Sequence, residues 1–327
     1  MINWEHKKVF VAGGAGMIGS HMSRRLLELG ADVTVADNLS SGSRKNTDHL
    51  YVDFRECDLR DRDVCDKLVR GKDVVFQLAA DMGGIGYITS IGAQIMHNSA
   101  QINLNMLNAA HKHEIPNYFY SSSACVYPEY RQLDANVTPL KESDAWPAQP
   151  DQFYGIEKLF TEKLCEAYQK DYGMNIRVAR FHNVYGHGYT AFDEAKSKAP
   201  CKMILRAIQN RPIEIWNDGL QTRSFLYIED CIDAVLKLMD SDFARPINIG
   251  SERLVTMKEL AKLVADASSK NVGVEHFPNK PLGVRGRNSD NTLIREALGW
   301  EPKVPMEVGL REVYEWGNKH YSELEGI

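Results

Sequence analysis

The fold of this chain is decided by Lys8-Val9-Phe10-Val11-Ala12-Gly13-Gly14-Ala15-Gly16-Met17-Ile18-Gly19. Residues 8–12 form an apolar run typical of a buried parallel strand, and an amphipathic helical pattern follows to about Glu28. The spaced glycines Gly13, Gly16 and Gly19 allow a tight turn that brings the backbone close to a phosphate, whose charge meets the unpaired N–H groups of the helix. The stretch predicts a βα unit that binds a pyrophosphate.

A second strand, Val33 to Ala36, ends at Asp37, where a ribose partner is expected. A carboxylate there accepts hydrogen bonds from both ribose hydroxyls and repels a 2′-phosphate, which favours NAD over NADP. Arg44 and Lys45 lie a few residues further on and would weaken that preference. The alternative is that Asp37 only caps a loop.

Further strands at 52–55 and 74–78 continue an alternation of strands and helices to about Phe181. This alternation predicts an α/β fold, a Rossmann-type doubly wound parallel sheet with a smaller, mixed α/β substrate-binding lobe. We expect the first lobe to span residues 1–181 and the second to lie mainly in 182–327. Strand patterns at 224–228 and 246–250 are candidates to return to the first lobe, which would make the second discontinuous.

Composition excludes several classes of protein. The chain has 327 residues, of which 43% are apolar and 25% charged, and its net charge of -5 argues against a nucleic-acid or anionic-membrane partner. The amino terminus is charged and carries no signal peptide pattern, so we expect a cytoplasmic protein. Six cysteines are scattered without a C-x-x-C, which indicates reduced thiols and no metal site.

Four residues suggest chemistry on an alcohol. Tyr154 and Lys158 are four apart on one predicted helix and share a face, so the ammonium should lower the pKa of the phenol. The phenolate could then take a proton from an alcohol while a nicotinamide oxidises it. Ser123 would reach the same alcohol, and Cys125, two residues later, would place a thiol beside the oxidised carbon. This thiol suggests a second acid/base step.

Together these motifs resemble the extended short-chain dehydrogenase/reductases, the superfamily that contains the nucleotide-sugar epimerases and dehydratases. The resemblance covers nearly the whole chain and rests on residues 13–19, 121–123, the Tyr154/Lys158 pair and residues 180–186. It implies that the tyrosine is the catalytic base, that the lysine orients the nicotinamide ribose and that Ser123 binds the reacting alcohol.

The resemblance also implies a tightly bound, recycled NAD. The residues expected to bind it are Gly13, Gly16, Met17, Ile18, Gly19, Asp37, Asp58, Leu59, Ala79, Ala80, Ser121, Ser122, Tyr154 and Lys158.

The residues after Ser123 narrow the reaction. Dehydratases of this superfamily carry Asp and Glu there, whereas this chain has Ala124 and Cys125. Simple 4-epimerases need no additional base at that point. Longer stretches, at 81–86, 122–129, 141–148 and 283–291, are similar to the GDP-mannose 3,5-epimerase family. A thiol at Cys125 therefore suggests proton transfer at carbon.

Membership of that family would imply that Cys125 removes a ring proton and that Lys198 returns one from the opposite face. A temporary ketone at carbon 4 would acidify the protons at carbons 3 and 5, and the products would be GDP-L-galactose, GDP-L-gulose or both. The segment 193–197 departs from the family pattern and is one residue longer, which leaves Lys196 as a second candidate for the acid.

A nucleoside diphosphate sugar, GDP-mannose by resemblance, needs positive charge, and arginine forks suit its phosphates. The residues expected to contact it are Gly83, Gly84, Gly86, Ser123, Glu129, Asn183, Lys198, Lys202, Trp216, Asp218, Gln221, Arg223 and Arg287. For the arginines, the alternative is an exposed or interdomain ion pair.

Two other functions stay open at this point. One is another NAD-dependent nucleotide-sugar epimerase, acting at carbon 4 alone or on a different nucleotide. The other is a catalytically silent NAD-binding sensor or scaffold. Helical patterns near 91–113 and 154–172 could bury apolar faces in a homodimer, as related enzymes do, or could simply face the core.

Overall fold

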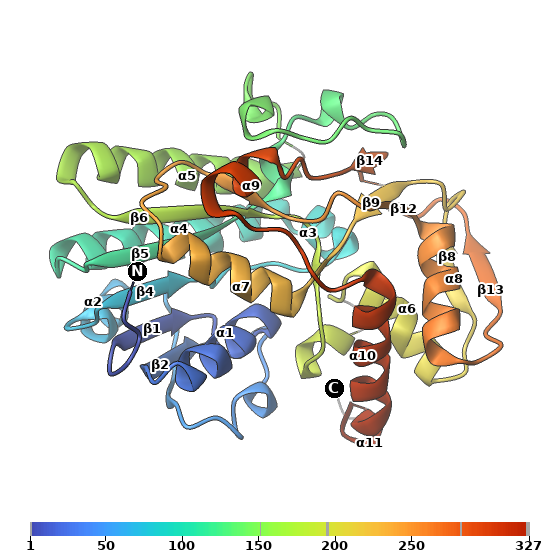
Figure 1. Ribbon diagram of the computed structural model, residues 1–327, viewed down its shortest axis with the longest axis horizontal. Coiled ribbons are helices and arrows are strands. Elements are labelled where there is room, and N and C mark those ends of the chain that lie inside the picture. Colours follow the sequence, from blue (N-terminus) through green and yellow to red (C-terminus); the bar gives the residue numbers. More distant parts are fainter. Residues whose placement is uncertain (1, 151, 194–195, 282, 325–327) are drawn as a thin grey trace.

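A seven-stranded parallel sheet forms the centre of the molecule (Figure 1). The computed structural model describes residues 2–150, 152–193, 196–281 and 283–324. The strand order is β11-β6-β5-β4-β1-β2-β3, which confirms the predicted doubly wound α/β fold. The strands are β1 (Lys8–Ala12), β2 (Asp32–Asp37), β3 (Asp53–Glu56), β4 (Val74–Gln77), β5 (Asn117–Ser123), β6 (Ile176–Phe181) and β11 (Ile247–Ile249).

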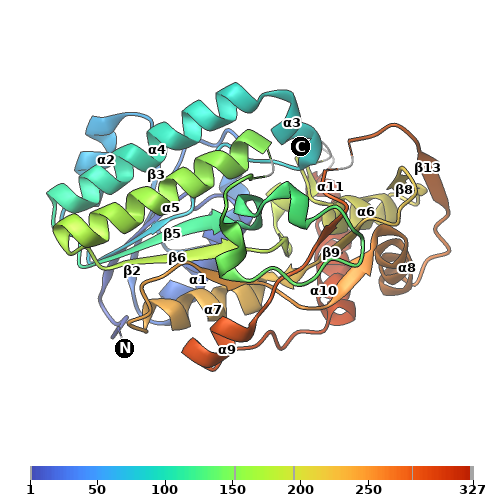
Figure 2. The same cartoon turned by 90° about the horizontal axis from the view of Figure 1, so that it is seen from above.

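Helices cover both faces of this sheet (Figure 2). Residues alternate along β1, so that Val9 and Val11 join the apolar core on one face while Phe10 and Ala12 join the core on the other. The helices α1 (Met17–Glu28) and α7 (Ile228–Met239) contact each other on the first face. The second face carries α2 (Arg62–Val69), α4 (Gly92–Lys112) and α5 (Gln152–Tyr172), with α3 (Ile85–Ser90) just before α4.

A smaller lobe is built mainly from the carboxyl-terminal half. Its strands are β8 (Ile213–Trp216), β9 (Thr222–Ser224), β12 (Leu254–Thr256), β13 (Val274–Phe277) and β14 (Gly286–Arg287). Its helices are α6 (Ala199–Ile208), α8 (Met257–Ser268), α10 (Met306–Lys319) and α11 (Tyr321–Leu324), whereas α9 (Thr292–Leu298) contacts β11 of the central sheet. The remaining pieces are β7 (Val184–Tyr185), β10 (Leu226–Tyr227) and the 3₁₀ turns η1 (Arg44–Asn46), η2 (Ala124–Val126), η3 (Glu129–Arg131), η4 (Glu142–Ala145) and η5 (Tyr189–Phe192).

The two segments proposed as return strands behave differently. The strand β11 pairs with β6 and extends the central sheet. Residues 224–228 do not join that sheet: β9 pairs with β12 and β14, and β10 pairs with β7. Such short strands can pair with whichever edge lies nearest, so their apolar pattern does not identify the partner.

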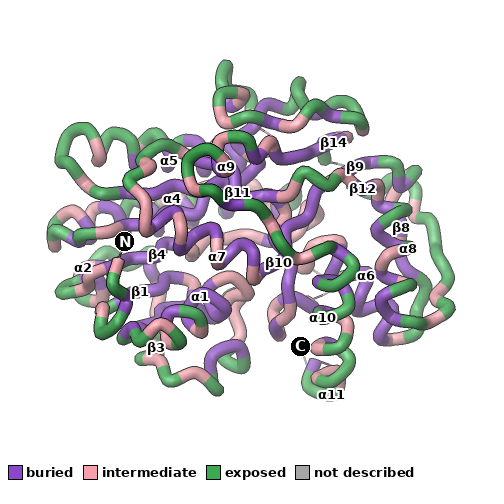
Figure 3. The backbone as a smooth tube through the Cα atoms, viewed as in Figure 1, coloured by how far each residue is buried: buried purple, intermediate pink, exposed green. Residues whose placement is uncertain are grey.

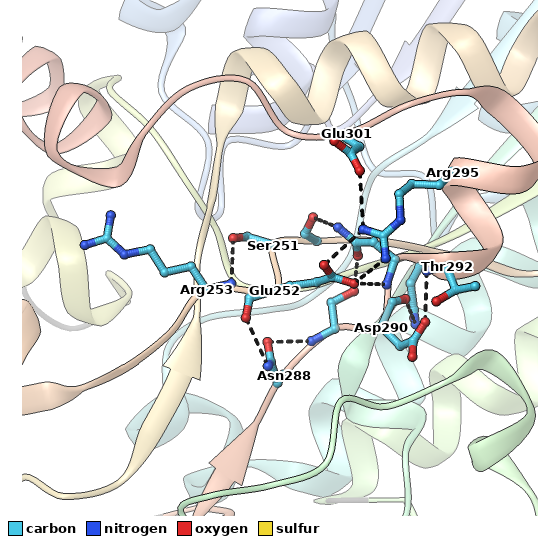
Figure 4. Close-up of polar contacts among 12 residues, drawn as sticks. Ser251, Glu252, Arg253, Asn288, Asp290, Thr292, Arg295 and Glu301 are labelled. Atoms are coloured by element: carbon cyan, nitrogen blue, oxygen red, sulfur yellow. Dashed lines mark hydrogen bonds and ion pairs between the residues drawn. The ribbon is translucent and has the colours of Figure 1, made fainter.

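A cluster of charges anchors the segment that follows β14 (Figure 4). Both oxygens of Glu252 accept hydrogen bonds from the guanidinium of Arg295, at 2.9 and 3.0 Å. The backbone N–H of Asn291 donates to the same carboxylate, and the side chain of Asn288 donates to the Glu252 carbonyl oxygen. The cluster therefore fixes the chain immediately after Arg287.

Burial follows this architecture, with the central strands buried and the outer faces of the helices exposed (Figure 3). Among the helices that the structure describes, none has the length and apolarity needed to cross a membrane.

Candidate active site

The glycine turn between β1 and α1 forms a cradle that matches a pyrophosphate. Gly13 has φ of +75°, and a Cβ at this position would lie 2.9 Å from the backbone of Ala79. A Cβ on Gly19 would lie 2.2 Å from the carbonyl oxygen of Gly13. Gly16 begins α1 without a side-chain cap, so the first N–H groups of the helix face the turn.

Two cavities meet over this turn. The first, of about 280 Å³, is lined by Asp37, Asp58, Leu59 and Ala79. The second, of about 230 Å³, is lined by Met17, Ile18, Gly19, Ser121, Ser122, Ser123, Tyr154 and Lys158. Gly13, Gly16 and Ala80 line both cavities. Each residue expected to bind NAD thus lines one cavity or the other, and together they suit an extended dinucleotide.

Asp37 lines the first cavity and also caps a loop. One carboxylate oxygen accepts from the N–H of Ala15 at 3.0 Å, and the other accepts from the N–H of Leu39 at 2.9 Å. Burial raises the pKa of Asp37, and the two backbone hydrogen bonds oppose this shift. The two roles considered from the sequence are therefore compatible.

Tyr154 and Lys158 lie in the second cavity but do not have the expected electrostatics. The Lys158 ammonium donates to the carbonyl oxygen of Ser121 at 2.9 Å and lies 5.6 Å from the Tyr154 ring centroid. Burial raises the pKa of Tyr154, assisted by the charge of Cys125, and burial lowers the pKa of Lys158. The expectation of a lowered phenol pKa is wrong for this structure because desolvation by burial is the largest effect on Tyr154 and raises its pKa.

Cys125 lies against the start of α5. A Cβ on Gly155 would be 2.1 Å from the Cys125 carbonyl oxygen, so a glycine is needed for this approach. The hydroxyl of Ser123 accepts from the Cys125 N–H at 3.2 Å. Arg287 donates to the Cys125 sulfur at 3.2 Å, although the two residues are far apart in sequence.

Gln132 holds Arg287 in place, and sequence reasoning missed it. This side chain is fully buried, and its oxygen accepts from the Nε–H of Arg287 at 2.6 Å. Its amide nitrogen donates to the carbonyl oxygens of Tyr127 and Pro128. A lone glutamine in a loop carries no sequence signal for this role.

The two candidate acids point to different places. Lys198 begins α6, and burial lowers the pKa of its ammonium while the charge of Cys125 acts in the opposite direction. The Lys196 ammonium instead donates to the carbonyl oxygen of Ser40 at 2.7 Å, on the side of the first cavity. Burial therefore distinguishes Lys198 from Lys196, whose ammonium reaches the exposed carbonyl group of Ser40. Residues 194 and 195 of the divergent segment lie outside the described residues.

Several expected substrate residues gather between the lobes. Gly83 lines the second cavity, and a Cβ on Gly84 would lie 2.9 Å from the Ser197 carbonyl oxygen. Arg223 in β9 is paired with Arg287 in β14. The side chain of Asn183, just before β7, donates to the Ser224 carbonyl oxygen at 2.9 Å.

Other residues expected to contact the substrate lie outside the two cavities. Lys202 lies 5.2 Å from the Trp216 ring centroid, and Gln221 donates to the Trp216 carbonyl oxygen. Of the thirteen residues expected to contact the substrate, Gly83, Ser123 and Lys198 line the second cavity and the other ten line neither cavity, among them Gly86, Glu129 and Asp218. Glu129 is exposed on η3, and Asp218 forms an exposed ion pair with Arg285. These three were predicted from resemblance alone.

A buried polar network lies behind the serine strand. Glu162 receives both a bidentate ion pair from Arg180 and a hydrogen bond from Ser122. The side-chain oxygen of Gln77 accepts a hydrogen bond from the N–H of Ala79, and its amide nitrogen donates to the side-chain oxygen of Asn103. These bonds fix the backbone that closes over the glycine turn. These contacts make the walls of the cavities rigid.

One group of potential metal ligands occurs among the described residues. Ligand atoms of His21, His187 and Glu229 lie within 4.8 Å of one another. Arg24 donates to the same Glu229 oxygen as His21, at 2.6 Å. The negative charge of the Glu229 carboxylate is thus already balanced by the Arg24 guanidinium, without a metal ion.

The chain belongs to the NAD dependent epimerase/dehydratase family, whose model matches residues 9–250. It is therefore an NAD-dependent enzyme, as the motifs predict. Over 95% of its length it is 46% identical to "GDP-mannose 3,5-epimerase 1" of Oryza sativa subsp. japonica, of which it covers 82%.

Solved structures agree with this class. The UDP-glucose 4-epimerase of Thermotoga maritima, solved with UDP-glucose, matches with a TM-score of 0.88 and 28% identity, covering 96% of this chain and 99% of that one. The UDP-glucose 4-epimerase of Thermus thermophilus, solved with NAD, matches with a TM-score of 0.83 and 25% identity, covering 94% and 98% of the two chains.

Proposed function

We propose that this enzyme is a GDP-mannose 3,5-epimerase, which converts GDP-mannose to GDP-L-galactose, GDP-L-gulose or both. The similarity to the rice enzyme supports this substrate. The observation that carries the proposal is that Tyr154 and Lys198 line the same cavity as Ser123, to which the backbone of Cys125 is hydrogen-bonded. A base for the alcohol is thus accompanied by two groups for proton transfer at carbon.

Inversion at carbons 3 and 5 requires an acidified C–H bond. A sugar C–H beside an alcohol is too weakly acidic for a side-chain base, whereas a ketone at carbon 4 acidifies both neighbouring positions through enolate formation. NAD, held by the residues that line the two cavities, would supply the hydride acceptor for carbon 4 and a positive charge. One ketone would then serve both inversions.

In this mechanism each proton transfer is carried out by a different side chain. Tyr154 takes the O4 proton, and Ser123 positions the O4 hydroxyl. Cys125 removes a ring proton from one face, and the guanidinium of Arg287 donates to its sulfur at 3.2 Å, so this step takes place beside a fixed cation. Lys198 returns a proton from the other face; because burial favours its neutral form, its ammonium is a better proton donor than an exposed lysine.

The residues that would bind the phosphates of the substrate belong to the smaller lobe. The guanidinium of Arg223 donates to the carbonyl oxygens of Thr222 and Val284, and Arg223 is the strand partner of Arg287. A pair of arginines on neighbouring strands suits the two phosphates of a nucleoside diphosphate. A diphosphate bound to Arg223 and Arg287 would lie close to Cys125, because Arg287 contacts the Cys125 sulfur, and its hexose could then reach the acid/base groups.

The test is incubation of the purified enzyme with GDP-mannose in heavy water, followed by NMR. We expect deuterium at carbons 3 and 5 together with L-sugar products, without added cofactor. Absence of exchange in protein with confirmed NAD content would contradict the proposal and favour another nucleotide sugar or epimerisation at carbon 4. Absence of turnover with every nucleotide sugar would favour a silent NAD-binding protein.

A Cys125→Ala variant separates these outcomes further. It removes the proposed carbon base and leaves Tyr154, so exchange at carbon should fall by roughly 10²-fold to 10⁴-fold. A simple 4-epimerase needs no thiol there and would keep its full rate. Retention of wild-type inversion by this variant would show that the 3,5-epimerase mechanism is wrong.

The assembly and compartment are further parts of this proposal. Exposed aromatic side chains on α5, Phe153 and Phe160, support a homodimer that pairs α4 and α5 of two copies. All six cysteines are unpaired, which supports a reducing compartment such as the cytoplasm.

A further inference from the structure

At the junction of the two cavities, one wall is formed by the start of α1 and carries a partial positive charge. The cavities share Gly13, Gly16 and Ser41, so a dinucleotide that fills both must pass its pyrophosphate over the start of α1. The helix start supplies N–H groups and a partial positive charge to that side of the pyrophosphate.

Lys196 belongs to another part of the cavity wall, next to Gly84. Its side chain lines the second cavity, while its ammonium donates to the carbonyl oxygen of Ser40 at 2.7 Å and lies 5.5 Å from the Tyr87 ring centroid. Ser40 and Tyr87 both line the first cavity. The Lys196 side chain therefore crosses the junction between the two cavities.

The backbone of Lys196 is held independently of its side chain. Its carbonyl oxygen accepts from the N–H of Gly84 at 2.8 Å, and its N–H donates to the carboxylate of Asp193 at 3.2 Å. These contacts fix the point from which the side chain extends. The ammonium therefore reaches the junction from a defined position.

The ammonium retains the capacity to bind an anion. An ammonium has three N–H donors, and the acceptor that it contacts within the described part of the chain is the Ser40 carbonyl oxygen. The described carboxylates that line the first cavity have other partners: Asp37 accepts from the N–H groups of Ala15 and Leu39, Asp58 pairs with Arg60, and Asp81 accepts from Tyr87 and Asn98. A carbonyl oxygen and an aromatic face orient a positive charge without neutralising it.

We propose that Lys196 binds the pyrophosphate of NAD from the part of the cavity wall next to Gly84. The start of α1 and the Lys196 ammonium would then hold the two phosphates from two parts of the wall. The proposal gives Lys196 a role distinct from the acid Lys198. It also gives a physical reason for retention of a coenzyme that is oxidised and restored within one catalytic cycle, because release of NAD must break a charge-assisted contact.

The test measures NAD retention rather than turnover. The holoenzyme is mixed with excess isotopically labelled NAD, and the exchange of bound coenzyme is followed. Lys196→Gln and Lys196→Met remove the charge, with Met keeping the aliphatic stem over Tyr87, and Lys196→Arg retains the charge. Lys262→Gln, an exposed lysine on α8, is the matched control. We expect exchange to be about tenfold faster in both neutral variants and unchanged in the control.

Competition identifies the part of NAD that is bound. In a fixed excess of NAD, the half-displacing concentration of ADP-ribose should stay the same in the Lys196→Gln protein, since both ligands lose the same contact. Adenosine lacks the pyrophosphate, so its half-displacing concentration should fall about tenfold. The Lys196→Arg protein should behave like wild type in both measurements.

Three outcomes would overturn the proposal. Unchanged NAD exchange in both neutral variants would show that the ammonium does not contact the coenzyme. An unchanged half-displacing concentration of adenosine, despite faster exchange, would show that Lys196 acts on the adenosine end through Ser40. Faster exchange in Lys196→Arg, equal to that in Lys196→Gln, would show that geometry matters and charge does not.

Discussion

Contacts of different kinds meet at Cys125, and each comes from a different part of the chain. Ser123 binds its N–H, Gly155 lets α5 approach its carbonyl oxygen, and Arg287 touches its sulfur. The sulfur is thereby held beside a cation, and the backbone cannot shift without disturbing the helix that carries Tyr154. At the scale of single residues, the site is therefore defined by its neighbours more than by the thiol itself.

The first prediction concerns the direction of proton transfer. Lys198→Met removes the acid on one face and leaves Cys125 as the base on the other. Inversion should fall by about 10²-fold to 10⁴-fold, while deuterium from heavy water should still enter carbons 3 and 5 with retention of configuration. NMR of the recovered GDP-mannose measures both quantities in one experiment.

A control places this effect at Lys198. Lys319→Met, at an exposed position on α10, should invert at the wild-type rate. Inversion at the normal rate by Lys198→Met, with loss of inversion in Lys196→Met, would transfer the acid role to Lys196.

At the scale of elements, the short strand β14 carries Arg287 and is tightly enclosed. A Cβ on Gly286 would lie 2.1 Å from the Asp134 carbonyl oxygen and 3.0 Å from Val137. Gly286→Ala must therefore move the backbone of β14 and the guanidinium that follows. We expect kcat/KM for the nucleotide sugar to fall by between tenfold and about 10²-fold, since catalysis is sensitive to displacements of about 1 Å.

The measurement for Gly286→Ala is steady-state kinetics together with NAD content. NAD binding should be unchanged because the cavities are formed by other elements. Gly273→Ala, where an added Cβ meets nothing within 4 Å, is the matched control. Equal kinetics for Gly286→Ala and wild type would show that β14 does not position the substrate.

We predict that the stability of the protein depends on pH through a buried histidine at the junction of β6 and β11. His182 directly follows β6, is fully buried, and donates to the Asn248 side-chain oxygen at 2.9 Å. Burial lowers its pKa to about 3. Below pH 6.5 the unfolded chain binds a proton at this histidine and the folded protein does not, so stability falls as pH decreases from about 6.5 toward 3.

Urea unfolding at pH 7 and pH 5 measures this effect. The His182 contribution to the loss at pH 5 is about 2 kcal/mol. In His182→Gln the loss of unfolding free energy between pH 7 and pH 5 should therefore be about 2 kcal/mol smaller than in wild type. The same pH dependence in both proteins would show that His182 is not the group responsible. His187, whose pKa burial lowers to about 4, acts in the same direction and is unchanged in the variant.

Elements whose signals are local could be predicted from sequence. The apolar run at 8–12 and the spaced glycines specify β1 and the start of α1 by periodicity and backbone freedom alone. The contact between Gln132 and Arg287 could not be predicted, since 155 positions separate them. The raised pKa of Tyr154 depends on how much of the molecule covers the phenol, which the four-residue spacing to Lys158 does not reveal.

At the scale of the whole molecule, one helical layer stays partly uncovered. The helices α4 and α5 lie side by side over the central sheet (Figure 2). Phe153, Ile156 and Phe160 of α5 are 58, 41 and 48% exposed, and Leu104 of α4 is 46% exposed. Positions 153, 156 and 160 follow the helical repeat and form one stripe. An apolar stripe on a long, paired helix layer is what a helical dimer interface requires.

The last prediction follows from this stripe. Phe160→Glu places a charge in the proposed four-helix contact, where burial without a partner costs several kcal/mol and should shift a dimer to monomer at micromolar concentration. Sedimentation equilibrium measures the mass, and NAD content shows whether the site survives. Val308→Glu makes the same change at a 45% exposed position on α10 and should remain dimeric. A wild-type protein that sediments as a monomer, or a Phe160→Glu protein that stays dimeric, would show that this helix layer is not the interface.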